Sequence, residues 1–96
     1  MQTQTRNAEF KALISLQNSM VLKAMGCQFD RGLSGGICVT LAGTGIGCWW
    51  YENGDYNFAR TAHQVPIMRT DTFDKIISQT AAFAHAHFVR SQSLVM

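Results

Sequence analysis

The fold of this chain is decided by the stretch Cys48-Trp49-Trp50-Tyr51-Glu52-Asn53-Gly54-Asp55-Tyr56-Asn57-Phe58-Ala59-Arg60. Its centre, Asn53-Gly54, is the strongest short signal for a β-hairpin, because both residues tolerate the positive φ of a type I′ turn. A two-residue turn also fixes the register of the two strands. The expected cross-strand pairs are Glu52–Asp55, Tyr51–Tyr56, Trp50–Asn57 and Trp49–Phe58.

Because side chains alternate along a strand, this hairpin has two largely apolar faces. One face carries Trp49, Tyr51, Tyr56, Phe58 and Arg60, and the other carries Ile46, Cys48, Trp50, Asn57, Ala59 and Thr61. Either the first face is the core, or it is exposed and contacts a partner. In both cases we expect at least one tryptophan outside the intramolecular core. The predicted binding interface comprises Trp49, Trp50, Tyr51, Tyr56, Phe58 and Arg60.

Working outward, β-branched and aromatic runs predict three strands. They cover Ile37–Ala42, Ile46–Glu52 and Asp55–Thr61, with a turn at Gly43-Thr44-Gly45 and connecting segments at residues 30–36 and 62–69. The glycines at 43, 45 and 47 resemble the spacing of a dinucleotide-binding loop, but a strand and a hairpin follow them instead of a helix. We therefore interpret them as structural, at a bulge or at a close approach of another backbone.

Helical periodicity predicts a first helix from Asn7 to about Met25, capped by Asn7, with Glu9 in its first turn and Gly26 ending it. Its expected apolar face is Phe10, Leu13, Ile14, Gln17, Met20, Val21, Ala24 and Met25, with Leu22 off that face. A second helix should run from a cap at Thr70 or Asp71 to about Arg90. Its expected apolar face is Phe73, Ile76, Ile77, Thr80, Phe83, Ala84, His87 and Phe88.

The order helix, three-stranded antiparallel meander, helix predicts an α+β two-layer sandwich. The 96 residues form one domain, 1–96, with a frayed N-terminus at residues 1–6 and a hydrophobic tail at residues 91–96. Hydrophobic residues make up 47% and charged residues 15%, a balance that excludes a disordered chain. No apolar run approaches a membrane span and no signal peptide is evident, so a cytoplasmic protein without membrane contact is expected.

No catalytic, cofactor or metal signature is evident in the sequence. The three cysteines, Cys27, Cys38 and Cys48, lack the spacing of a disulfide framework or a zinc site, and we interpret them as reduced core residues. His85 and His87 would share a face only in a strand, whereas the surrounding pattern is helical. We therefore predict no enzyme activity, no cofactor and no metal.

These observations favour a small non-enzymatic protein-binding domain, an inhibitor or adaptor, with a homodimer as one form of the contact. Motif-poor domains of this size are common among phage and mobile-element proteins, so an anti-CRISPR-like inhibitor of a host nuclease complex is one expectation by class analogy. The alternative is RNA or single-stranded DNA binding through an exposed aromatic sheet face. The net charge of +2 and scattered basic residues favour a protein partner over nucleic acid. A third hypothesis is a small enzyme with a Cys/His pair that uses one of the cysteines and His63.

Overall fold

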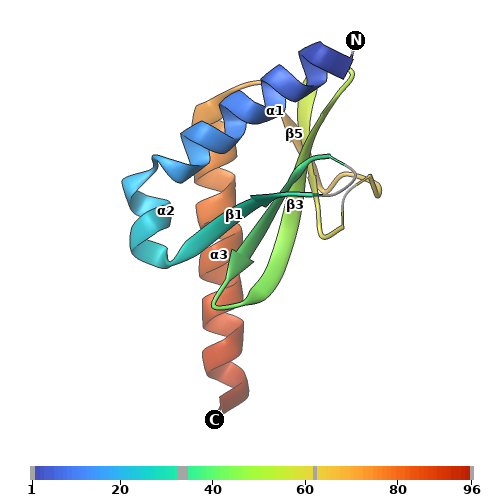
Figure 1. Ribbon diagram of the computed structural model, residues 1–96. Helices are drawn as coiled ribbons and strands as arrows, with labels where there is room; N and C mark the ends of the chain where they lie inside the picture. Colours follow the sequence, from blue (N-terminus) through green and yellow to red (C-terminus); the bar gives the residue numbers. More distant parts are fainter. Residues whose placement is uncertain (1, 33–34, 62, 96) are drawn as a thin grey trace.

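The computed structural model describes residues 2–32, 35–61 and 63–95. Its elements are α1 (Gln2–Gln17), α2 (Met20–Met25), β1 (Cys27–Arg31), β2 (Ile37–Leu41), β3 (Thr44–Glu52), β4 (Asp55–Ala59), β5 (Met68–Thr70) and α3 (Phe73–Val95) (Figure 1). The strands form one antiparallel sheet in the order β1-β2-β3-β4-β5. The predicted α+β class is confirmed, and the meander has five strands where the sequence predicted three.

The central hairpin has the predicted turn and register. Asn53 and Gly54 have φ values of 56° and 82°, as a type I′ turn requires. The four predicted cross-strand pairs are all present between β3 and β4. The buried side chain of Asn57 braces the turn, because its amide nitrogen lies 3.1 Å from the carbonyl oxygen of Asp55 and 3.4 Å from that of Glu52.

The sequence interpretation missed both edge strands. The strand β1 begins directly after Gly26, and Cys27 and Phe29 alternate with exposed residues as in a half-buried strand. The strand β5 is only three residues long and follows Pro66, so it has too few side chains to show alternation. Parts of the predicted connecting segments, Leu33, Ser34 and Ala62, lie outside the described residues.

The single first helix predicted from the sequence is wrong, because the chain breaks it into α1 and α2. Ser19 has extended backbone angles, and its hydroxyl accepts a hydrogen bond from the Leu22 backbone N–H at 3.3 Å, which starts a new helix. The break changes the helical phase, so each later residue of this segment points in a different direction from the one expected in a continuous helix. As a result Leu22, expected off the apolar face, is fully buried, whereas Met20 and Val21 are exposed. Gly26 ends α2 in the left-handed conformation, as predicted.

The buried face of α1 differs from the predicted one. Its buried residues are Glu9, Ala12, Leu13 and Leu16, which follow i, i+3, i+4, i+7 spacing. The sequence pattern missed this face because it includes a charged residue and a small one, while Phe10 and Ile14 on the outer side are larger and apolar. Asn7 is not a cap, since α1 begins at Gln2.

The helix α3 follows the prediction more closely. Thr72 caps it in place of Thr70 or Asp71, and its hydroxyl accepts a hydrogen bond from the Lys75 backbone N–H at 3.3 Å. Ile76, Thr80 and Ala84 of the predicted apolar face are buried, but Phe88 is 53% exposed. Figure 1 shows the C-terminal half of α3 extending beyond the sheet, which leaves fewer partners for Phe88. The side chains of the predicted hydrophobic tail, residues 91–96, lie outside the described residues.

A β-bulge interrupts the pairing of β2 with β3. Val39 pairs with Gly47 and Thr40 pairs with Gly45, so Ile46 is the extra residue between them. The predicted structural role of these glycines is confirmed. At Gly47 the close neighbour is a side chain rather than a backbone, because an added Cβ would lie 2.1 Å from the Phe58 ring. The turn itself is at Ala42-Gly43, one residue before the predicted position.

We predict that Gly47→Ala destabilises the fold by about 1–3 kcal/mol, because the new methyl group overlaps the buried ring of Phe58. Gly45→Ala is the matched control, since no atom lies within 4 Å of the position its Cβ would take. Urea unfolding followed by tryptophan fluorescence measures both. Equal midpoints for the two variants would contradict the packing argument.

Candidate functional site

The structure buries most of the predicted binding interface. Trp49 and Phe58 are fully buried, Trp50 is 1% exposed and Tyr56 is 6% exposed. Of the six residues, Tyr51 is half-buried and Arg60 is exposed. The first of the two alternatives therefore holds, because the face with Trp49 and Phe58 belongs to the core. Without a rearrangement, the four buried side chains have almost no surface that a partner could contact.

Both long helices contact this aromatic face. The Trp49 indole Nε1–H donates a 2.9 Å hydrogen bond to Thr80 Oγ1 of α3, and the Thr80 hydroxyl donates to the Ile76 carbonyl at 2.7 Å. The rings of Phe58 and Phe83 stack with centroids 4.6 Å apart. On the α1 side, the Tyr56 hydroxyl donates to the Ala8 carbonyl at 2.9 Å. The polar groups of Trp49, Tyr56 and Thr80 are thus paired, which makes burial of these aromatics favourable.

Trp50 is buried on the opposite face of the hairpin. Its ring packs against His63, with centroids 5.5 Å apart, and Gly36 lies beside its Cβ atom. Chain segments that connect the strands therefore cover Trp50. Because both tryptophans are buried, the prediction of a tryptophan outside the core is wrong. Its indole nitrogen is the one buried side-chain polar atom without a hydrogen-bond partner among the described residues.

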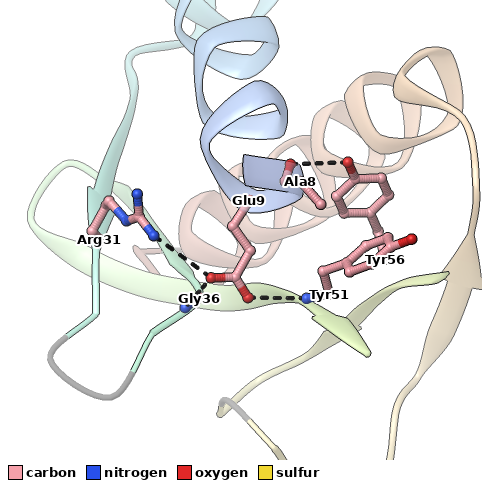
Figure 2. Close-up of polar contacts among 6 residues, drawn as sticks. All are labelled: Ala8, Glu9, Arg31, Gly36, Tyr51 and Tyr56. Atoms are coloured by element: carbon pink, nitrogen blue, oxygen red, sulfur yellow. Dashed lines mark hydrogen bonds and ion pairs between the residues drawn. The ribbon is translucent and has the colours of Figure 1, made fainter. Parts of the chain in front are cut away.

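The most buried charge of the described chain is the Glu9 carboxylate, which the sequence analysis placed only as a first-turn acid. Glu9 is 4% exposed. Oε1 accepts a hydrogen bond from the Gly36 backbone N–H at 3.0 Å, and Oε2 accepts one from the Tyr51 backbone N–H at 3.1 Å (Figure 2). Arg31 Nη2 lies 3.8 Å from Oε1. One side chain of α1 thus connects β1, the start of β2 and β3, and we name this group the Glu9 clamp.

Burial shifts the pKa of two groups in this region. Desolvation, followed by the charges of Tyr51 and Glu9, raises the pKa of the Tyr56 phenol. Desolvation also raises the pKa of the Cys27 thiol, which lowers its thiolate fraction near neutral pH and makes it a poor nucleophile. The Cys38 and Cys48 sulfur atoms lie 3.5 Å apart across β2 and β3, without a disulfide.

The exposed apolar side chains gather mainly on the helices. On α1, Phe10 and Ile14 lie one turn apart and are 52% and 40% exposed. On α2, Met20 is 80% and Val21 is 58% exposed. We name Phe10, Ile14, Met20 and Val21 the outer helical surface. Sequence periodicity identified all four as one apolar face, but it assigned them to the core.

The remaining sequence-predicted features are placed as follows. His85 and His87 both lie in α3, as the helical interpretation predicts, with His85 exposed and His87 half-buried. Among the described residues, no three His, Cys, Asp or Glu side chains are grouped so that they could hold a metal ion. Within the same residues, no helix is long and apolar enough to cross a membrane.

No protein-family model, curated protein or solved structure matches the chain.

We predict that Glu9→Gln destabilises the fold by about 1–3 kcal/mol, because the neutral amide accepts one of the two backbone hydrogen bonds and presents its NH₂ donor to the other N–H. Glu52→Gln, at the exposed end of the hairpin, is the matched control and should change stability by less than about 0.5 kcal/mol. Chemical denaturation at pH 7 measures both. If the two variants are equally stable, the carboxylate does not anchor α1 to the sheet.

We also predict an alkaline loss of stability caused by Tyr56. Because the folded pKa is raised, the folded state retains the phenolic proton, and stability falls as pH rises above the ordinary value of about 10. Tyr56→Phe should lower the free energy of unfolding by about 1 kcal/mol at pH 7, because the hydrogen bond to the Ala8 carbonyl is lost. The stability of this variant should depend less on pH above 10. Tyr51→Phe is the control and should keep most of the alkaline loss, because desolvation, the largest cause of the raised Tyr56 pKa, remains. Unfolding midpoints between pH 8 and 11 test this, and identical profiles for all three proteins would refute it.

Proposed function

We propose that the chain is a non-enzymatic protein-binding domain, an inhibitor or adaptor, whose contact is made by the outer helical surface and not by the aromatic hairpin. The observation that carries the proposal is the exposure of Phe10, Ile14, Met20 and Val21, between 40% and 80%, on two consecutive helices. Single exposed apolar residues are ordinary. A group of four on adjoining helices is typical of a surface that another protein covers.

The geometry also indicates the kind of partner. Phe10 and Ile14 are spaced i, i+4, so both project from the same side of α1. A helix that presents apolar anchors one turn apart is recognised by a hydrophobic groove. The exposed polar residues Asn7 and Lys11 lie beside these anchors on α1 and would form part of a solvated rim. The expected partner is therefore a protein with an apolar groove wide enough for one helix.

The alternative of RNA or single-stranded DNA binding loses the feature on which it was based. Base stacking requires exposed aromatic rings. Trp49 and Phe58 have no exposed surface, and Tyr56 has little. The more specific expectations, a phage or mobile-element inhibitor of a host nuclease complex and a homodimer, remain proposals that rest on class analogy and on the apolar surface.

The test replaces the two α1 anchors together, Phe10→Gln with Ile14→Gln, against a control double variant at exposed positions of α3, Lys75→Gln with His85→Gln, outside the outer helical surface. Affinity capture from the source cells should recover the same partner with wild type and control, and at least about tenfold less with the anchor variant. Light scattering of the pure proteins is measured in parallel. A wild-type dimer that becomes a monomer only in the anchor variant would identify a second copy as the partner.

Because both anchor residues are exposed, their replacement should leave thermal unfolding nearly unchanged, and this measurement shows that the variant is folded. The proposal fails if a folded anchor variant captures the partner as well as wild type does. It also fails if the wild-type protein is monomeric and captures only proteins that the anchor variant captures as well.

A further inference from the structure

A cavity of about 260 Å³ lies between the sheet and the C-terminal half of α3, away from the outer helical surface. The sheet contributes Ile46 at the bulge, together with Phe58 and Arg60 from β4 and the residue that follows it. The helix contributes Phe83, His87 and Arg90, which share one face at i, i+4, i+7 spacing. The bulge matters here, because regular alternation would place Ile46 on the opposite face from Phe58.

The floor of the cavity is apolar and aromatic. The rings of Phe58 and Phe83 are stacked with an interplanar angle of 30°, and Ile46 packs against the same core cluster. Ile67 completes this lining and is 54% exposed, so the cavity is open to solvent on that side. Phe58 has no exposed surface, so the half-buried ring of Phe83, together with Ile46 and Ile67, provides the surface for a flat apolar group.

The rim is cationic. Arg60 and Arg90 approach the cavity from the sheet and from the helix, and the imidazole of His87 lies one turn from Arg90. None of the described residues that line the cavity is acidic. The one ion pair among the described residues joins Arg31 to Glu9, so within that part of the chain neither Arg60 nor Arg90 is neutralised by a carboxylate. Two guanidinium groups above an apolar floor favour an anion, because each presents a planar set of donors to a carboxylate or phosphate.

From this arrangement we propose that the cavity between α3 and the β3–β4 strands binds a small organic anion, with its flat apolar body on Phe83, Ile46 and Ile67 and its carboxylate or phosphate between Arg60 and Arg90. The size limits the ligand. The volume of about 260 Å³ exceeds the roughly 150 Å³ of an apolar cavity that binds benzene, so one aromatic ring with its anionic group has room here. Benzoate has this size and chemistry, and benzamide is its neutral isostere.

The experiment is a two-dimensional ¹H–¹⁵N NMR titration of the full chain with benzoate, phenyl phosphate, benzamide and inorganic phosphate. Benzoate or phenyl phosphate should shift the amide signals of Gly45 and Ala86 saturably, with a dissociation constant of about 1 mM or tighter. Benzamide should bind at least about tenfold more weakly because it lacks the charge. Inorganic phosphate should also bind more weakly, because it lacks the apolar body. The relative affinities of benzoate and phenyl phosphate show which anionic group the site prefers.

Variants connect the binding to the named residues. Arg60→Gln and Arg90→Gln should each weaken benzoate binding about fivefold. The matched control Arg69→Gln should not weaken it, since Arg69 is exposed on β5 opposite Asn57, on the face of the sheet away from Phe58. Ala86→Leu, a change that helices tolerate, should fill the cavity and abolish binding without altering charge.

The proposal is overturned if benzamide binds as well as benzoate, or if Arg60→Gln and Arg90→Gln bind benzoate as Arg69→Gln does. It is also overturned if no signal from the cavity shifts saturably with either organic anion. Because the cavity and the outer helical surface share no residue, these outcomes are independent of those expected for the protein partner.

Discussion

The register of the β3–β4 hairpin is the constraint on which the other contacts depend. Asn53 and Gly54 both adopt positive φ, so the turn has two residues and Trp49 is opposite Phe58. A shift of one residue would move each side chain to the other face of the sheet. The indole of Trp49 would then lose Thr80, and the ring of Phe58 would lose both Phe83 and the space above Gly47. Local turn chemistry thereby determines where the helices can pack.

The Glu9 clamp is the second constraint on the fold, because it determines where α1 lies along the sheet. Hydrophobic burial alone does not fix how far α1 slides along the sheet, because Ala12, Leu13 and Leu16 could pack in several positions. A buried carboxylate satisfies its acceptors in far fewer positions, and here its two oxygens accept hydrogen bonds from the backbone N–H groups of Gly36, just before β2, and of Tyr51 in β3. The same residue explains why the sequence pattern gave the wrong face for α1. Periodicity counts a charged residue as exposed, while the structure compensates its burial with two hydrogen bonds and Arg31.

The sequence was sufficient to predict features that depend on a local signal. It was insufficient for features that tertiary contacts determine. The hairpin pairs, Gly26 as a helix end and the buried residues Ile76, Thr80 and Ala84 of α3 were predictable from turn chemistry and spacing. The break at Ser19 was not, because a serine inside an apolar helical pattern is compatible with both continuation and a new cap. The edge strand β5 has too few residues for alternation to be visible. Nor could alternation decide which hairpin face is covered, since both faces are apolar and the covering residues, Thr80 and His63, come from distant parts of the chain.

The same considerations explain why the proposed binding surfaces make little use of the aromatic side chains of the hairpin. Large aromatic side chains gain the most from burial, so a small domain with a limited core uses them internally. Residues then remain exposed where helix geometry leaves them without an intramolecular partner. Phe10 and Ile14 are on the outside because Glu9 and Leu13 face the sheet. Arg60 and Arg90 line one cavity together with Ile46, the extra residue of the bulge. A change at the bulge should therefore alter the cavity and leave the outer helical surface intact, which would separate the two proposed binding roles within one small fold.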